Sequence, residues 1–314
     1  MTQAQMRVTD PYPTRGEKEE MIPRADPVVY GNGRPLGEHS LSAEQLASYE
    51  EQGFILLPGV FGADEVAELC RETERLKADR SLIGRDELVL EPDSNRARSI
   101  FGVHRFSPVF DRLSRDARVL DKVRQILGSD VYIHHSRINI KRPVSGKSFP
   151  WHSDFETWHA EDGMPRMRAL SAWVMLTENT EFNGPLYLVP GSHRKFVACR
   201  GYTPDEHHKQ SLRRQEYGVP SLDALRQLVD AGGLAGAYGP PGTLVIHESN
   251  IMHGSPDNIT PDARTNAFFV YNSVKNTPVE RPFAARDFRP EFLGGRDFQP
   301  LTPLDPVTRY PPGA

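Results

Sequence analysis

Two histidine-bearing segments contain the residues of this chain whose types and spacing suit metal chemistry. His152 and Asp154 form a His-x-Asp pair, and His253 follows far along the chain. Two imidazoles and one carboxylate on one face of an ion leave three coordination positions open, which is the ligand set of non-haem Fe(II) oxygenases. Residues i and i+2 of a strand point to the same face, so we expect His152 and Asp154 to reach one ion from one strand end, with the third ligand supplied by a distant strand. The spacing therefore predicts an iron site that activates O2.

The third ligand has two candidates on the sequence, His253 and His247. Gly254 and Ser255 follow His253 and allow a close approach of the backbone, which favours His253. His247 could lie on the same barrel face, either as a pocket residue or as a buried imidazole with its hydrogen bonds satisfied.

Arg264 follows His253 by eleven residues. On an antiparallel pair of strands joined by a short turn, this offset would return the chain to the metal. A guanidinium binds a carboxylate through two parallel hydrogen bonds, and the distal carboxylate of 2-oxoglutarate is the expected ligand. The alternative is an arginine on the protein surface.

The bulk composition is that of an ordinary globular protein. The chain has 314 residues, 38% of them hydrophobic and 25% charged, with a net charge of −4. The basic residues are dispersed, so nothing predicts binding to nucleic acid or to a membrane. The sequence contains no apolar run of about 18 residues and no signal-like apolar core at its start. Cys70 and Cys199 have no metal-binding or disulfide spacing, so we expect reduced thiols in a cytoplasmic protein.

Helical patterns come first along the chain and strand patterns follow. Residues 1–40 are expected to be an N-terminal extension packed on the domain, and residues 41–314 a single domain. Helices are expected at 42–53, 63–77, 117–127 and 221–229, and strands at 54–57, 131–133 continuing into 138–140, 169–176, 185–189, 243–246 and 266–270. This order predicts a mainly β fold with flanking helices, and a double-stranded β-helix (a cupin-like jelly roll) accommodates the metal ligands as well.

Five segments of the sequence resemble the ectoine hydroxylases, which belong to the phytanoyl-CoA dioxygenase superfamily of Fe(II)- and 2-oxoglutarate-dependent enzymes. The segments are DPYPTR at 10–15, WHSDFETWHAEDGMPRM at 151–167, EFNGPLYLVPGSH at 181–193, KQSLRRQEYGVP at 209–220 and MHGSPDNITP at 252–261. The resemblance covers nearly the whole chain, and its motifs are far longer than a bare His-x-Asp.

The resemblance implies a jelly-roll homodimer that uses O2 to convert ectoine into 5-hydroxyectoine. It implies that His152, Asp154 and His253 bind the iron and that Trp158 lies beside the substrate. For 2-oxoglutarate it implies a site of Arg264, Asn139, Phe149 and Ser255. Related halogenases have a small residue at the position of Asp154, so the carboxylate here implies hydroxylation.

Three positions near the expected substrate pocket depart from the family pattern. His135 stands where the family has Gln, Trp173 where it has a small residue, and His247 where it has Phe. These changes favour an alternative substrate, another amino acid or natural-product intermediate. For a small zwitterion such as ectoine, aromatic faces can bind the amidinium, and Arg137 or Arg289 can bind the carboxylate.

Several other polar residues are expected to lie at the surface. Glu161 and Asp162 are interpreted as a solvated turn before Gly163, because the iron chemistry needs no pair of carboxylic acids. His134, His207 and His208 are expected on the surface.

Overall fold

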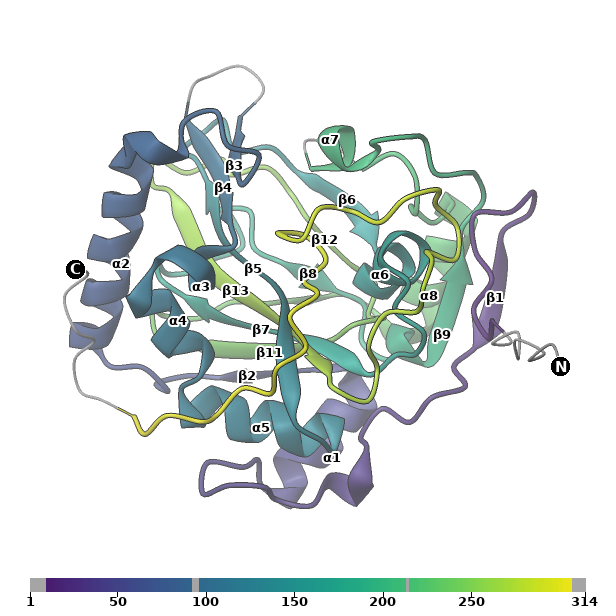
Figure 1. Ribbon diagram of the computed structural model, residues 1–314, viewed down its shortest axis with the longest axis horizontal. Coiled ribbons are helices and arrows are strands. Elements are labelled where there is room, and N and C mark those ends of the chain that lie inside the picture. The colour runs from purple at the N-terminus through teal and green to yellow at the C-terminus, as the bar shows by residue number, and fades with distance from the viewer. Residues whose placement is uncertain (1–9, 92–95, 213–214, 307–314) are drawn as a thin grey trace, which may run out of the picture.

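The computed structural model describes residues 10–91, 96–212 and 215–306, and Figure 1 shows its sheets flanked by helices. Its largest sheet is antiparallel, in the order β2-β11-β7-β13-β5-β4-β3. The strands are β2 (Phe54–Leu57), β3 (Leu88–Leu90), β4 (Ala97–Phe101), β5 (Val131–Lys141), β7 (Ala169–Met175), β11 (Leu244–Glu248) and β13 (Arg264–Ser273).

A smaller four-stranded sheet, in the order β10-β8-β12-β6, packs against the inner face of the large one. It consists of β6 (Phe149–His152), β8 (Tyr187–Leu188), β10 (Ala235–Gly236) and β12 (His253–Ser255). A separate pair joins β1 (Glu20–Pro23) to β9 (Lys195–Ala198). The two facing sheets form the jelly roll that the order of elements predicted.

The helices lie mostly outside the large sheet. They are α1 (Ala43–Gln52), α2 (Ala63–Ala78), α3 (Val103–Phe106), α4 (Pro108–Ser114), α5 (Ala117–Leu127), α6 (Asp154–Asp162), α7 (His208–Ser211) and α8 (Leu222–Gly232), with short 3-10 turns at Gly31–Gly33, Arg80–Leu82 and Ser192–Arg194. The Ser42 side chain accepts from the Gln45 amide at the start of α1, and Gly53 ends that helix in the left-handed region. No helix in the described part of the chain is long and apolar enough to cross a membrane.

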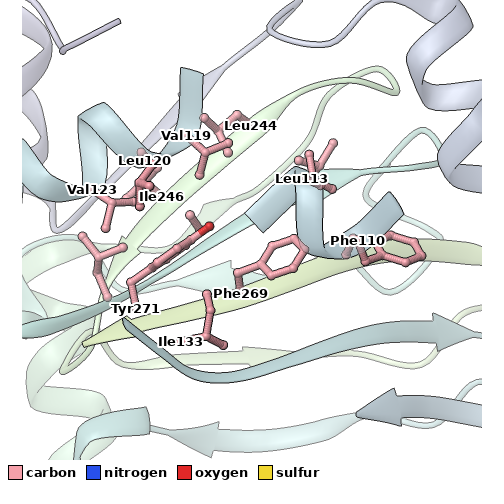
Figure 2. Close-up of a cluster of buried hydrophobic side chains, with 14 of the residues drawn as sticks. Phe110, Leu113, Val119, Leu120, Val123, Ile133, Leu244, Ile246, Phe269 and Tyr271 are labelled. Atoms are coloured by element: carbon pink, nitrogen blue, oxygen red, sulfur yellow. The ribbon is translucent and has the colours of Figure 1, made fainter. Parts of the chain in front are cut away.

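The main hydrophobic core lies between the helices and the outer face of the large sheet. In Figure 2, Leu120 and Val123 of α5 lie over Ile246 of β11 and over Phe269 and Tyr271 of β13. A second apolar cluster fills the space between the two sheets, so both faces of the central strands are buried. Apolar side chains at alternate positions of these strands therefore hold the sheet rigidly between two layers.

A bulge in β5 decides which of its residues face the interior. His135 pairs with Val270 and Ile133 pairs with Tyr271, which leaves His134 as the extra residue. Beyond the bulge, Ile138 and Ile140 join the outer core. The alternate residues His135, Arg137, Asn139 and Lys141 therefore point between the sheets.

Most expected elements are present with nearly the expected bounds, although two expectations needed revision. The two short strands at 131–133 and 138–140 form one continuous strand, β5. The strand expected at 185–189 is reduced to Tyr187–Leu188.

Candidate active site

His152, Asp154 and His253 lie together where the small sheet meets α6. His152 ends β6 and pairs directly with His253 at the start of β12, and the two ring centroids are 4.2 Å apart. Asp154 is the first residue of α6. The three ligand atoms that these side chains offer lie within 4.8 Å of one another.

Backbone contacts fix which nitrogen of each histidine is free. Nδ1 of His152 lies 2.8 Å from the Pro150 carbonyl and Nδ1 of His253 lies 3.0 Å from the Ile251 carbonyl. A carbonyl oxygen only accepts, so each Nδ1 donates its proton and each Nε2 presents a lone pair to the cluster. Burial, followed by the nearby His152, lowers the pKa of His253 to about 3, which keeps this ring neutral at neutral pH.

The third group of the cluster is an ionised carboxylate. Oδ1 of Asp154 lies 3.6 Å from Nε2 of His152 and 3.9 Å from Nε2 of His253. Burial alone would raise the pKa of Asp154, but His253 and His152 outweigh it and hold that pKa well below its ordinary value. Two atoms that each lie about 2.1 Å from one ion can be no more than about 4.2 Å apart, so both distances fit a shared metal.

A first cavity, the Arg264 cavity, opens on one side of this cluster. It is lined by His152, His253, Asn139, Phe149, Ser255, Arg264 and Lys141, among others. Arg264 is 3% exposed and donates to Oδ1 of Asn139 at 3.0 Å and to the Gly184 carbonyl at 2.8 Å. Among the described residues it has no carboxylate partner, and burial with the nearby Arg137 lowers its pKa to about 9. An unpaired buried guanidinium of this kind suits an anionic ligand.

A second cavity, the Trp158 cavity, adjoins the first and reaches the cluster at His152 and Asp154. Its lining includes Asp154, Trp158, His135, Glu161 and Arg289, and it shares His152, Phe149, Phe101, Leu212 and Arg137 with the Arg264 cavity. The cluster of His152, Asp154 and His253 therefore borders two adjoining cavities. Both have charged and aromatic groups in their lining, and the Arg264 cavity is the richer in arginine and lysine.

Comparison with known proteins identifies the family. The sequence profile described as phytanoyl-CoA dioxygenase matches residues 49–266. The chain belongs to the phytanoyl-CoA dioxygenase family. It is 51% identical over 298 residues to the ectoine dioxygenase of Bordetella bronchiseptica, an alignment that covers 94% of this chain and 96% of that protein.

Crystal structures of EctD from S. alaskensis show the same fold. The structure with 2-oxoglutarate and 5-hydroxyectoine matches with a TM-score of 0.85 at 44% identity, over 95% of this chain and 99% of that one. The structure with bound Fe has a TM-score of 0.84 at the same identity and coverage. The resemblance to this dioxygenase family and the jelly-roll fold inferred from the sequence are thus confirmed.

Two geometric expectations from the sequence were wrong. Asp154 does not share a strand with His152, because the chain leaves β6 at Ser153 and Asp154 begins α6. Arg264 does not return on a hairpin with His253, because β12 and β13 belong to different sheets. Arg264 instead reaches the cavity from the opposite sheet, where it pairs with Lys141 in register.

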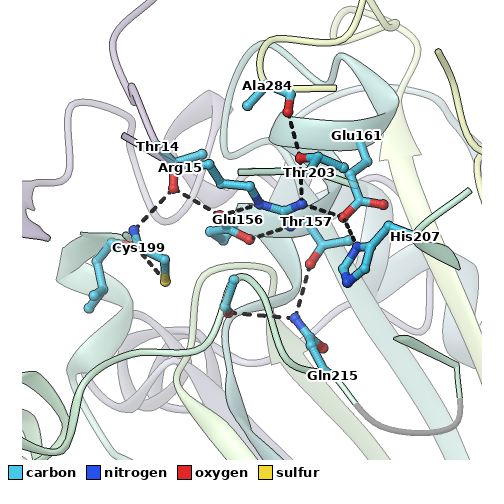
Figure 3. A network of polar contacts seen from close by, with 12 residues as sticks. Thr14, Arg15, Glu156, Thr157, Glu161, Cys199, Thr203, His207, Gln215 and Ala284 are labelled. Carbon is cyan, nitrogen blue, oxygen red and sulfur yellow. Dashed lines mark hydrogen bonds and ion pairs between the residues drawn. The ribbon is translucent and has the colours of Figure 1, made fainter. Parts of the chain in front are cut away.

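The expectation of a solvated turn at Glu161 and Asp162 was wrong, as was that of surface positions for His134 and His207. All four residues are at most 5% exposed. Glu161 lies 2.6 Å from Arg15 and 3.0 Å from His207, and Figure 3 shows this network of polar contacts. Asp162 contacts His134 at 2.9 Å and also binds Arg289. These carboxylates escaped sequence reasoning because their cations come from distant segments.

The remaining candidates for substrate binding differ in whether they line a cavity and in whether they already pair with another residue. Arg289 is committed to Asp162, whereas Arg137 forms no ion pair among the described residues and lies 5.0 Å from the Phe268 ring centroid. Trp173 is fully buried against Phe268 in the inner core and lines neither cavity. His247 also lines neither cavity, and its Nε2 lies 3.8 Å from Oδ2 of Asp154.

Lys141 is a cavity residue that sequence reasoning missed. It is 5% exposed, and its Nζ donates to Oγ of Ser255 at 2.8 Å and to the Pro256 carbonyl. Burial, with the nearby Arg264 and Arg98, lowers the pKa of Lys141 to about 6. The signal was present in the sequence, because the period-two pattern that leads from His135 through Arg137 to Asn139 continues to Lys141.

Proposed function

We propose that this protein is an Fe(II)- and 2-oxoglutarate-dependent dioxygenase that hydroxylates ectoine to 5-hydroxyectoine. The observation that carries the proposal is the cluster of His152, Asp154 and His253 at the border of two adjoining cavities. A chain 51% identical to an ectoine dioxygenase, with this cluster in place, supports the same chemistry.

The three clustered side chains would hold the iron. The two imidazoles present neutral Nε2 lone pairs and Asp154 presents an ionised oxygen, a donor set suited to Fe(II). When bound, the iron would supply the redox chemistry that couples O2 and 2-oxoglutarate to oxidation of a C–H bond. The role of the protein is to hold the two organic molecules on either side of the cluster, so that the reacting groups are close together.

The Arg264 cavity would bind 2-oxoglutarate. Arg264 faces the distal carboxylate, with Asn139 holding the guanidinium in place and Ser255 and Phe149 lining the walls. We add Lys141 to this site as a second cation, because it is buried beside Arg264 and already donates to Ser255. Two adjacent cations suit the distal carboxylate, because the 2-oxo acid end of the ligand would face the metal position.

The Trp158 cavity would bind ectoine. Its aromatic rings offer faces for the amidinium, and Arg137, without a carboxylate partner among the described residues, is the group left to bind the substrate carboxylate. The Nδ1–H of His135 donates to the Leu293 carbonyl at 3.2 Å, which leaves Nε2 to accept a hydrogen bond from a substrate N–H group. His135 therefore supplies the acceptor that the family glutamine would offer.

The alternative substrate, another amino acid or natural-product intermediate, rested on His135, Trp173 and His247. Of these residues, His135 lines the Trp158 cavity, while Trp173 and His247 do not. Of the three departures from the family pattern, only the one at His135 therefore changes the lining of the proposed pocket.

A coupled assay tests the substrate. The purified protein with Fe(II), 2-oxoglutarate and O2 is supplied with ectoine or with each of a panel of free amino acids. Succinate release and 5-hydroxyectoine are followed by NMR. We expect one succinate per hydroxylated ectoine at about 1–1,000 turnovers per second. A larger stimulation of succinate release by another amino acid than by ectoine would contradict the proposal.

We further propose a homodimer in the cytoplasm. The family resemblance supports the dimer, and the two free thiols, Cys70 and Cys199, accord with a reducing compartment. Sedimentation equilibrium measures the mass of the assembly, and fractionation of the source cells locates the protein.

A further inference from the structure

The two oxygens of the Asp154 carboxylate face different partners. Oδ1 faces the histidines of the cluster, 3.6 Å from Nε2 of His152 and 3.9 Å from Nε2 of His253. Oδ2 faces away from the cluster, 3.5 Å from Oγ of Ser171 and 3.8 Å from Nε2 of His247. One oxygen is therefore directed at the metal position and the other at a polar pair behind it.

His247 is a buried imidazole without a hydrogen-bond partner. It is 2% exposed, and in the described structure neither ring nitrogen has a partner. Buried polar groups normally have their hydrogen bonds made, so an unsatisfied imidazole in such a place needs a reason. One acceptor, Oδ2 of Asp154, lies 3.8 Å from its Nε2.

The elements that carry His247 and Ser171 hold them side by side. His247 on β11 and Ser171 on β7 are direct partners in the antiparallel register, in two adjacent strands of the large sheet. Both strands are packed on both faces, because their neighbouring residues alternate between the outer and inner cores. The positions of His247 and Ser171 are thus fixed by the sheet, next to Asp154 at the start of α6.

We propose that His247 and Ser171 are positioning residues that hold Oδ2 of Asp154, so that the carboxylate offers the metal only Oδ1. The His247 ring donates from Nε2 and the Ser171 hydroxyl donates from Oγ, and one carboxylate oxygen accepts both. The 3.8 Å separation is a contact, and a movement of about 0.6–0.9 Å makes it a hydrogen bond. This inference rests on the proposed function, because it assigns a role around the same metal site.

The consequence is a free coordination position. A carboxylate that bound through both oxygens would occupy one of the three positions that two imidazoles and one oxygen leave open. A chelating 2-oxo acid and O2 together need all three. Outer partners of this kind orient metal ligands, and their loss typically weakens metal binding by about 10–100-fold.

Cobalt affinity tests the proposal without turnover. Co(II) binding is measured by competition with a fluorescent chelator, without 2-oxoglutarate or O2, for the wild type, His247→Phe, His247→Gln and Ser171→Ala. We expect Kd to rise about 10–100-fold in His247→Phe and Ser171→Ala. His247→Gln keeps an N–H donor and should restore affinity to within a few-fold of wild type. The visible spectrum of bound Co(II) should change in His247→Phe but not in His247→Gln.

The controls distinguish failure of the role proposed for His247 from failure of the proposed metal site. His104→Phe removes a half-buried imidazole that bonds to Ser136 away from both cavities, and it should bind Co(II) as the wild type does. Wild-type affinity in His247→Phe, with thermal melts showing a folded protein, would overturn the role of His247. Loss in His247→Gln together with retention in His253→Ala would instead make His247 a ligand and also overturn it. Wild-type binding that survives Asp154→Ala would refute the proposed metal site itself.

Discussion

At the level of single residues, the cations without a carboxylate partner distinguish the two cavities from the rest of the protein. Most buried charges here are paired, as Arg15 is with Glu156 and Glu161. Arg264 and Arg137 have no such partner among the described residues; Arg264 lines the first cavity, and Arg137 lines both. Isolated buried charge is costly, so its persistence beside a cavity indicates an anionic ligand.

Arg264→Ala tests whether the protein uses 2-oxoglutarate. Loss of a two-pronged contact with a carboxylate should raise the KM for 2-oxoglutarate by about 10–100-fold, because hydrogen bonds to charged groups contribute about 1.5–3 kcal/mol. Steady-state kinetics with varied 2-oxoglutarate measure the effect. Unchanged activity in this variant would indicate a metal enzyme that does not need the 2-oxo acid.

Lys141 should make 2-oxoglutarate binding depend on pH. Its pKa is lowered to about 6 by burial, Arg264 and Arg98, against the smaller opposing effects of Asp257 and Glu91. A bound carboxylate stabilises the ammonium and raises this pKa, so binding takes up a proton. Affinity should therefore fall as pH rises above about 6, by at most about tenfold per pH unit. Titration calorimetry of the metal-loaded protein in buffers of different ionisation enthalpy counts the protons.

Lys141→Met should bind 2-oxoglutarate more weakly and should lose this part of the pH dependence. Lys147→Met is the matched control, because Lys147 lines the same cavity but its side chain is 58% exposed. A Lys141→Met variant that retains the wild-type pH profile would exclude Lys141 as the proton acceptor.

At the level of elements, α6 connects the N-terminal segment to the proposed metal site. Arg15 binds Glu156 at 3.0 Å and Glu161 at 2.6 Å, and both carboxylates belong to the helix that begins with Asp154. Thr14 adds a bond to Glu156 and accepts from the amide of Cys199, as Figure 3 shows. A segment that precedes every strand thus fixes the orientation of a helix that carries a ligand.

Arg15→Met should destabilise the protein by about 3–5 kcal/mol, because it leaves two buried carboxylates without their cation. Urea denaturation followed by circular dichroism measures the change. Arg226→Met is the control, since Arg226 also pairs with a carboxylate, Asp223, but the two side chains are 69% and 86% exposed. That pair should contribute about 0–1 kcal/mol. Equal losses in the two variants would contradict the structural role assigned to Arg15.

The helix layer outside the large sheet should affect stability but not chemistry. Leu120 of α5 is fully buried in the outer core, separated from both cavities by the sheet. Leu120→Ala should reduce the free energy of unfolding by about 2–5 kcal/mol. The kcat/KM measured well below the melting temperature should stay within about twofold of wild type. Arg124→Ala, on the exposed side of the same helix, should cost about 0–1 kcal/mol.

At the level of the whole molecule, buried carboxylates paired across distant segments should set the acid limit of stability. Burial alone would raise the pKa of Glu161, but the hydrogen bond to His207 and the charge of Arg15 lower it from 4.5 to about 2. A carboxyl group whose pKa is lower in the folded state contributes stability above its unfolded pKa. That contribution is lost as pH falls through the folded pKa.

The free energy of unfolding should therefore decline between pH 4.5 and about 2, with Glu161 contributing up to about 1.4 kcal/mol per pH unit. Glu161→Gln should be less stable than wild type at pH 7, and the difference should shrink as the pH falls through this window. Melting temperatures across the pH range give the comparison, with the exposed Glu51→Gln as control. A difference that stays constant with pH would rule out the ionised form of Glu161 as the source.

The sequence by itself determined the class of fold, the four longest of the described helices and the identity of the clustered residues. Local signals sufficed for these, because a capping serine, a terminal glycine and the spacing of apolar residues act within one element. The long motifs around His152 and His253 carried the family identity.

Only the tertiary structure decided how the site is assembled. It placed Asp154 on a helix and brought Arg264 from the opposite sheet. It also buried Glu161, Asp162, His134 and His207, which local sequence could not reveal because their partners lie far away along the chain. Burial and ion pairing depend on which distant segments meet in space, so they are properties of the packed molecule.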